Sequence, residues 1–71
     1  MDILIFETNI NTTEDLIKVR QLLTAESRIK NWSVDMDDID KILRIESINI
    51  SSDSIENLLS EADFQCRSLH Y

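Results

Sequence analysis

The sequence contains neither glycine nor proline, and its only cysteine is Cys66. A chain of 71 residues with average composition would carry about five glycines and three or four prolines. Every turn must therefore be made by Asn, Asp and Ser, which tolerate left-handed backbone and hydrogen-bond to it locally. A glycine-rich phosphate loop is excluded. Because a lone cysteine cannot form an internal disulfide, we expect a reducing, cytoplasmic setting.

Long apolar runs and an excess of basic residues are also absent. No run approaches the roughly 20 apolar residues of a membrane helix, and the acidic start MDILIFE is unlike a signal peptide. Fourteen acidic residues against seven basic ones give a net charge of -7. This charge repels nucleic acid and anionic membranes, so we expect neither as a partner, and it favours a basic protein or a cation. Solubility alone is the alternative explanation of the charge.

The stretch from Ile29 to Glu46, IKNWSVDMDDIDKILRIE, predicts a β-hairpin. Val34 and Met36 alternate with polar residues before the turn, and Leu43 and Ile45 do so after it. The turn, around residues 37–40, lacks the Asn-Gly or Asp-Gly pair of a tight hairpin. We therefore expect a loop of about four residues.

A helix is predicted on each side of the hairpin. The first has Asn11 as its N-cap, or Thr12 one residue later, and runs to about Ala25 with apolar residues at helical spacing. The second is capped by Ser51 or Ser52 and has its own apolar stripe. Both helices are long enough to cover one face of a small sheet.

Strand-like runs at residues 2–7 and 64–69 complete the order β-α-β-β-α-β. Right-handed crossovers with both helices on one side give an antiparallel sheet of order 4-1-3-2. The predicted fold class is therefore α+β, a ferredoxin-like sandwich formed by residues 1–71 as a single domain. No predicted element remains to cover the second face of the sheet.

The stretch LLTAESRIKNWSVDM resembles the heavy-metal-associated domain family, which includes small copper chaperones and the N-terminal modules of metal-pumping ATPases. It matches that family's end of helix one, turn and second strand. The family has apolar residues at the positions of Leu23 and Ile29. It has Val, Asp and Leu at the positions of Val34, Asp35 and Met36. The family's frequent Ala-Gly-Tyr corresponds to residues 62–64, Ala-Asp-Phe. The resemblance covers most of the chain and implies the same fold.

The family's defining motif, Met-x-Cys-x-x-Cys, lies in the loop that opens helix one. Counting back from Ile29 places its two cysteines at about Thr12 and Asp15, and its methionine at Ile10. Hydroxyl and carboxylate oxygens are poor substitutes for the thiolates that bind Cu(I) or zinc in such loops. The resemblance therefore implies a fold without the thiolate metal site, and we expect no cofactor.

Metal-ligating residue types also occur at two other places. The hairpin tip carries carboxylates that suit a hard cation such as Ca²⁺, on Asp35, Asp37, Asp38 and Asp40. The tip lacks the glycine and the bidentate glutamate of a calcium loop, so a solvated tip is the alternative. Cys66 and His70 lie close together near the C-terminus. Because Cys66 alternates with Phe64 toward the helices, we expect a buried, unreactive thiol.

The uncovered face of the sheet predicts an interaction surface. Following the family resemblance, we assign Leu4 and Phe6 of the first strand to the helix side. The candidate patch on the open side then consists of Ile3, Ile5 and Ile42, and we add Trp32 of the edge strand. Apolar residues gathered on an acidic surface suggest association. A half-buried tryptophan that closes the end of the core is the alternative for Trp32.

These observations predict a small non-catalytic interaction module, whose partner is a protein or a second copy of the chain. An enzyme is disfavoured because the chain is short for a deep pocket and its lone histidine has no partner predictable from the sequence. One alternative is a heavy-metal binding or transport protein with a non-standard weak site. Another is an ACT-type small-molecule sensor, which shares this order of elements but usually binds near a glycine-bearing loop.

Overall fold

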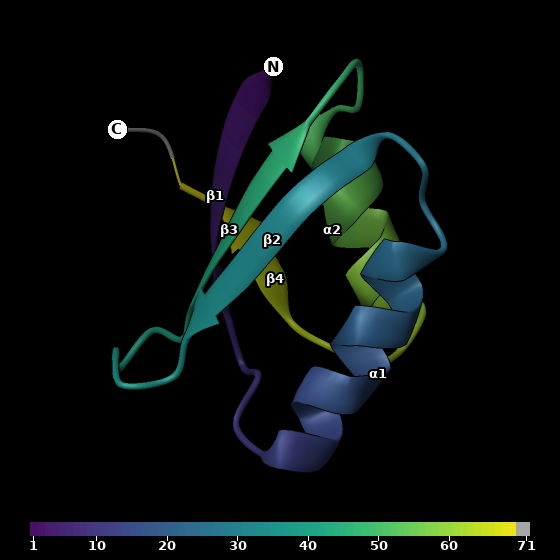
Figure 1. Ribbon diagram of the computed structural model, residues 1–71. Helices are drawn as coiled ribbons and strands as arrows, with labels where there is room; N and C mark the ends of the chain where they lie inside the picture. The colour runs from purple at the N-terminus through teal and green to yellow at the C-terminus, as the bar shows by residue number, and fades with distance from the viewer. Residues whose placement is uncertain (70–71) are drawn as a thin grey trace.

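The computed structural model describes residues 1–69 and has the predicted order of elements. These are β1 (Asp2–Thr8), α1 (Thr13–Thr24), β2 (Ile29–Asp35), β3 (Ile42–Ser47), α2 (Ser52–Ser60) and β4 (Cys66–Ser68). The antiparallel sheet has the order β2-β3-β1-β4, which is the predicted order read from the other edge. Both helices lie on the same side of the sheet (Figure 1). The predicted ferredoxin-like α+β sandwich is confirmed.

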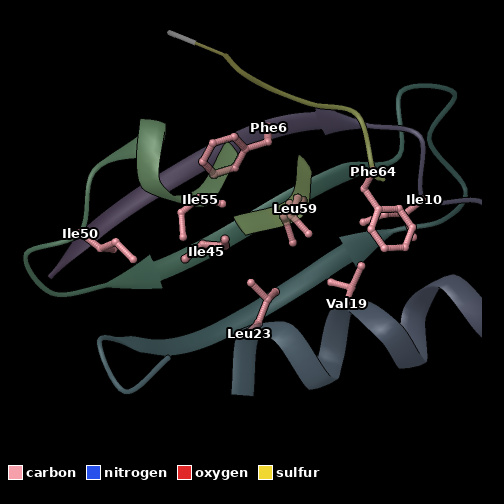
Figure 2. Close-up of a cluster of buried hydrophobic side chains, with 10 residues drawn as sticks. Phe6, Ile10, Val19, Leu23, Ile45, Ile50, Ile55, Leu59 and Phe64 are labelled. Atoms are coloured by element: carbon pink, nitrogen blue, oxygen red, sulfur yellow. The ribbon is translucent and has the colours of Figure 1, made fainter. Parts of the chain in front are cut away.

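The core lies between the sheet and the helices (Figure 2). Phe6 of β1 and Leu43 and Ile45 of β3 are fully buried, and Leu4 packs against the core. The register pairs Leu4 with Ile45 and Phe6 with Leu43, and residues directly opposite each other share a sheet face. The faces predicted for these residues are therefore confirmed. The helices add Val19, Leu23, Ile55 and Leu59.

The end of α2 explains why β4 is shorter than the predicted strand over residues 64–69. The Asp63 N–H donates to the carbonyl of Ser60 at 2.9 Å, and the Phe64 N–H donates to that of Leu59 at 3.0 Å. This is the Schellman pattern, which places a left-handed residue just after the helix. That residue is Asp63, with φ 66°. The turn therefore extends to Phe64, and the Gln65 N–H that follows donates to Oδ1 of the Asn9 side chain at 2.9 Å, so the strand begins only at Cys66.

Within residues 1–69, turns without glycine leave three residues at positive φ, namely Lys41 at 47°, Asn49 at 54° and Asp63 at 66°. Asn and Asp tolerate this conformation, as predicted, whereas lysine is a less common choice. Ser47 is fully buried on the helix side of β3, and its Oγ has no hydrogen-bond partner within residues 1–69. No helix in the described part of the chain has the length and apolar character needed to cross a membrane.

Candidate functional site

The loop that opens α1 places Thr12 and Asp15, the positions aligned with the missing cysteines, in a capping box. Thr12 Oγ1 accepts from the Asp15 N–H at 3.0 Å, and Asp15 Oδ2 accepts from the N–H groups of Asn11 at 3.0 Å and Thr12 at 3.2 Å. The N-cap is therefore Thr12, the predicted alternative, and not Asn11. The Asn11 N–H is the main cause that lowers the pKa of the Asp15 carboxyl below 3.8. Both side chains thus stabilise the start of the helix.

Ile10, aligned with the family's methionine, is fully buried and belongs to the core. Within residues 1–69, no three or more His, Cys, Asp or Glu side chains come together in a way that could hold a metal ion. At the start of α1, Ile10 therefore packs in the core, and Thr12 and Asp15 cap the helix.

Carboxylates at the hairpin tip fold the loop onto itself. Asp35 Oδ1 accepts from the Asp37 N–H at 3.1 Å, and Asp38 Oδ1 accepts from the Asp40 N–H at 2.8 Å. These are Asx turns, in which a side chain replaces a backbone acceptor. The tip is also joined to β1, because the Thr8 N–H donates to the carbonyl of Asp40 at 3.0 Å. Loop formation thus accounts for Asp35 and Asp38 without a bound cation.

Cys66 lines a hollow of about 660 Å³ formed by residues of β1, α2, β4 and the hairpin tip. Burial, with a smaller effect from the charge of Glu56, raises the pKa of the Cys66 thiol to about 12. A thiol that stays protonated at neutral pH is a poor nucleophile and a poor metal ligand. Glu56 Oε1 accepts from the Ser68 N–H at 2.8 Å. His70, the predicted companion of Cys66, lies outside the described residues.

The open face of the sheet carries Ile3, Ile5 and Ile42, on the side assigned to them from the family resemblance. Ile3 is 53% exposed, and Ile5 and Ile42 are half-buried. The residues of β3 opposite Ile3 and Ile5 are Glu46 and Arg44, which form an ion pair at 3.7 Å. Charged side chains of β3 therefore lie next to the isoleucines of β1 on this face.

Trp32 does not join these isoleucines. It pairs with Ile45 and packs against the buried core, so it lies on the helix side of the sheet. The sequence contained this signal, because Trp32, Val34 and Met36 alternate on one face. This is the alternative interpretation of the tryptophan, and its placement in the candidate patch is corrected.

Leu69 is a patch residue that the sequence analysis missed. Its N–H donates to the carbonyl of Ile5 at 2.8 Å, and it follows Ser68, which pairs with the core residue Phe6. By alternation, Leu69 lies on the open face beside Ile5. The same alternation was readable in the predicted last strand. We define the open-face patch as Ile3, Ile5, Ile42 and Leu69.

Comparison with known proteins gives a clear likeness of fold. No family model and no curated protein matches the sequence. The solved yeast copper transporter domain Ccc2a, described in apo and Cu(I)-loaded states, superposes with a TM-score of 0.82 at 14% identity, over 96% of this chain and 94% of that chain. The N-terminal domain of ZntA in its Zn(II) form superposes with a TM-score of 0.77 at 13% identity, over 93% and 89% of the two chains. The chain therefore shares the ferredoxin-like fold of these two solved domains.

Proposed function

We propose that this domain is a non-catalytic protein-binding module that uses the open-face patch and has no thiolate metal site. The observation that carries the proposal is the exposure of Ile3, at 53%, beside the half-buried Ile5. Both lie on a sheet face that neither helix covers. Burial of apolar surface against a partner contributes roughly 25 cal/mol per Å², so the patch offers a source of binding free energy.

Charged pairs on the same face indicate the class of partner. Arg44 pairs with Glu46 and Arg67 pairs with Glu7, so both signs of charge stand next to the apolar residues. A protein surface with an apolar centre and a mixed polar rim matches this arrangement. The net charge of -7 adds long-range attraction to a basic partner. The lone cysteine supports a role in a reducing compartment such as the cytoplasm.

The test compares two lysine substitutions at isoleucines. Ile5→Lys places a charge in the patch, whereas Ile17→Lys changes an isoleucine of α1 that is 52% exposed. Affinity capture with quantitative mass spectrometry should find a protein that Ile5→Lys loses and Ile17→Lys retains. Titration calorimetry with that purified protein should show the same difference in Kd. Equal capture by both variants would contradict the proposal, and so would unfolding of Ile5→Lys in circular dichroism, since Ile5 would then face the core.

The Cu(I) and Zn(II) states named for the two similar structures favour a second candidate, a metal-handling domain with a non-standard weak site. Under our proposal, the unmodified chain takes up no stoichiometric Cu(I) or Zn²⁺ in competition with a strong chelator. The double substitution Thr12→Cys with Asp15→Cys should create Cu(I) binding. Stoichiometric uptake by the unmodified chain would support the second candidate, and its loss on Cys66→Ser would locate the site.

A further inference from the structure

The outward-facing backbone groups of the edge strand β2 can be identified from its pairing. The Ile48 N–H donates to the carbonyl of Arg28 at 2.9 Å, so the ladder next to β3 is hydrogen-bonded at Arg28. Bonded residues alternate along an antiparallel strand, but a register shift between Ile29 and Asn31 moves the alternation by one residue. Beyond the shift, the N–H and C=O groups that point away from β3 belong to Trp32 and Val34.

The Trp32 N–H has an unusual partner that supports this direction. It donates to Oδ1 of Asn31, the preceding residue, at 2.9 Å. A side chain on the exposed edge can accept this bond when the N–H points outward. The register shift also places Lys30 at the irregularity. A bulge, a lysine and a capped N–H are features by which edge strands avoid pairing with other chains.

We propose that the free edge of β2 is a self-pairing surface for β2 of a second copy of this chain, and that Asn31 holds it closed. In an antiparallel pair with its twofold axis at Ser33, Trp32 lies opposite Val34 of the partner copy. These residues carry the outward N–H and C=O groups, so each pair can exchange both backbone hydrogen bonds. In each copy, the Asn31 side chain accepts the hydrogen bond of the Trp32 N–H, which is one of the donors that the pair requires. This bond must break before the two strands can pair.

The side chains of β2 are self-complementary in this arrangement. Trp32 and Val34 both pack on the helix side of the sheet, and an aromatic residue opposite a β-branched one is a favourable cross-strand pair. Lys30 and Asp35 lie toward opposite ends of the strand. Antiparallel pairing therefore brings each toward the opposite charge of the partner copy, which makes a local attraction between chains that each carry a charge of -7.

The experiment measures self-association of the full chain by sedimentation velocity over a concentration series. Asn31→Ala should strengthen dimerisation about tenfold relative to the parent, because a dimer then forms without breaking a capping hydrogen bond in each copy. Adding Val34→Pro should return Asn31→Ala to the monomer. Proline removes an N–H that points outward and leaves the bonds to β3 intact.

A second blocking variant keeps the test decisive if Val34→Pro fails to fold. Ser33 is exposed, and Ser33→Asp places like charges directly opposite each other at the proposed axis. The Asn31→Ala, Ser33→Asp variant should therefore be monomeric. The proposal is wrong if Asn31→Ala associates no more than the parent, or if Ser33→Asp leaves its dimer unchanged. Loss of the dimer on Ile5→Lys instead would assign self-association to the open-face patch.

Discussion

Truncation of Leu23 to alanine tests how α1 packs on the sheet. Leu23 is 1% exposed and belongs to the core between the helices and the strands. Removing its branched end costs roughly 2.4 kcal/mol at about 0.8 kcal/mol per carbon, and the residual cavity raises the loss to about 2.7–5 kcal/mol. A domain of this length has about 4–11 kcal/mol of unfolding free energy. Leu23→Ala should therefore remove a large part of the stability.

The assay is thermal and urea unfolding followed by the fluorescence of Trp32, which packs against the core. Leu23→Ala should lower Tm by more than about 10 °C, because each 1 kcal/mol corresponds to about 4–8 °C in a small domain. The control is Ile17→Ala in the same helix, where the side chain is 52% exposed and the expected change is within about 0.5 kcal/mol. Equal losses at both positions, or a shift of only a degree or two for Leu23→Ala, would refute this packing of α1.

Further substitutions probe the turns, the core and the caps. Asp63→Gly should raise the unfolding free energy by about 0.5–1 kcal/mol, because glycine adopts positive φ without strain. A lower unfolding free energy, measured by urea unfolding, would contradict the Schellman turn. Ser47→Ala should leave the unfolding free energy unchanged or raise it by up to about 1 kcal/mol, since the buried Ser47 hydroxyl lacks a hydrogen-bond partner. A clear loss of unfolding free energy in the same assay would indicate that the hydroxyl has a partner. Asp15→Asn should destabilise the fold at pH 7. A carboxyl whose pKa is lowered in the folded state stabilises the fold while it is ionised, and this effect is complete above its ordinary pKa of 3.8. The difference in stability between Asp15→Asn and the parent should therefore disappear as the pH falls through the lowered pKa of Asp15. Iodoacetamide at pH 8 should alkylate Cys66 far more slowly in the folded chain than in urea, because its pKa is raised to about 12, and equal rates would place the thiol in solvent.

Local patterns predicted most of the fold. The alternation of Val34 and Met36 with polar residues predicts the hairpin strand, and the hydroxyl of Thr12 just before the apolar stripe makes it a possible N-cap. The start of β4 was not predicted, because it depends on the turn that follows α2 and on the contact between the Gln65 N–H and the Asn9 side chain. The faces of β1 required the family resemblance, since both of its alternating sets are apolar and alternation alone cannot choose between them.

The sequence by itself determined the order of elements, the turns without glycine and the absence of thiols at the start of α1, because each depends on residue type and short spacing. Only the tertiary structure decided that charged residues of β3 stand beside Ile3 and Ile5, and that Asn31 caps the outward N–H of Trp32. Both depend on the register between strands. A shift of one residue changes which backbone groups bond to the neighbouring strand, and the shift between Ile29 and Asn31 arises from pairing with β3.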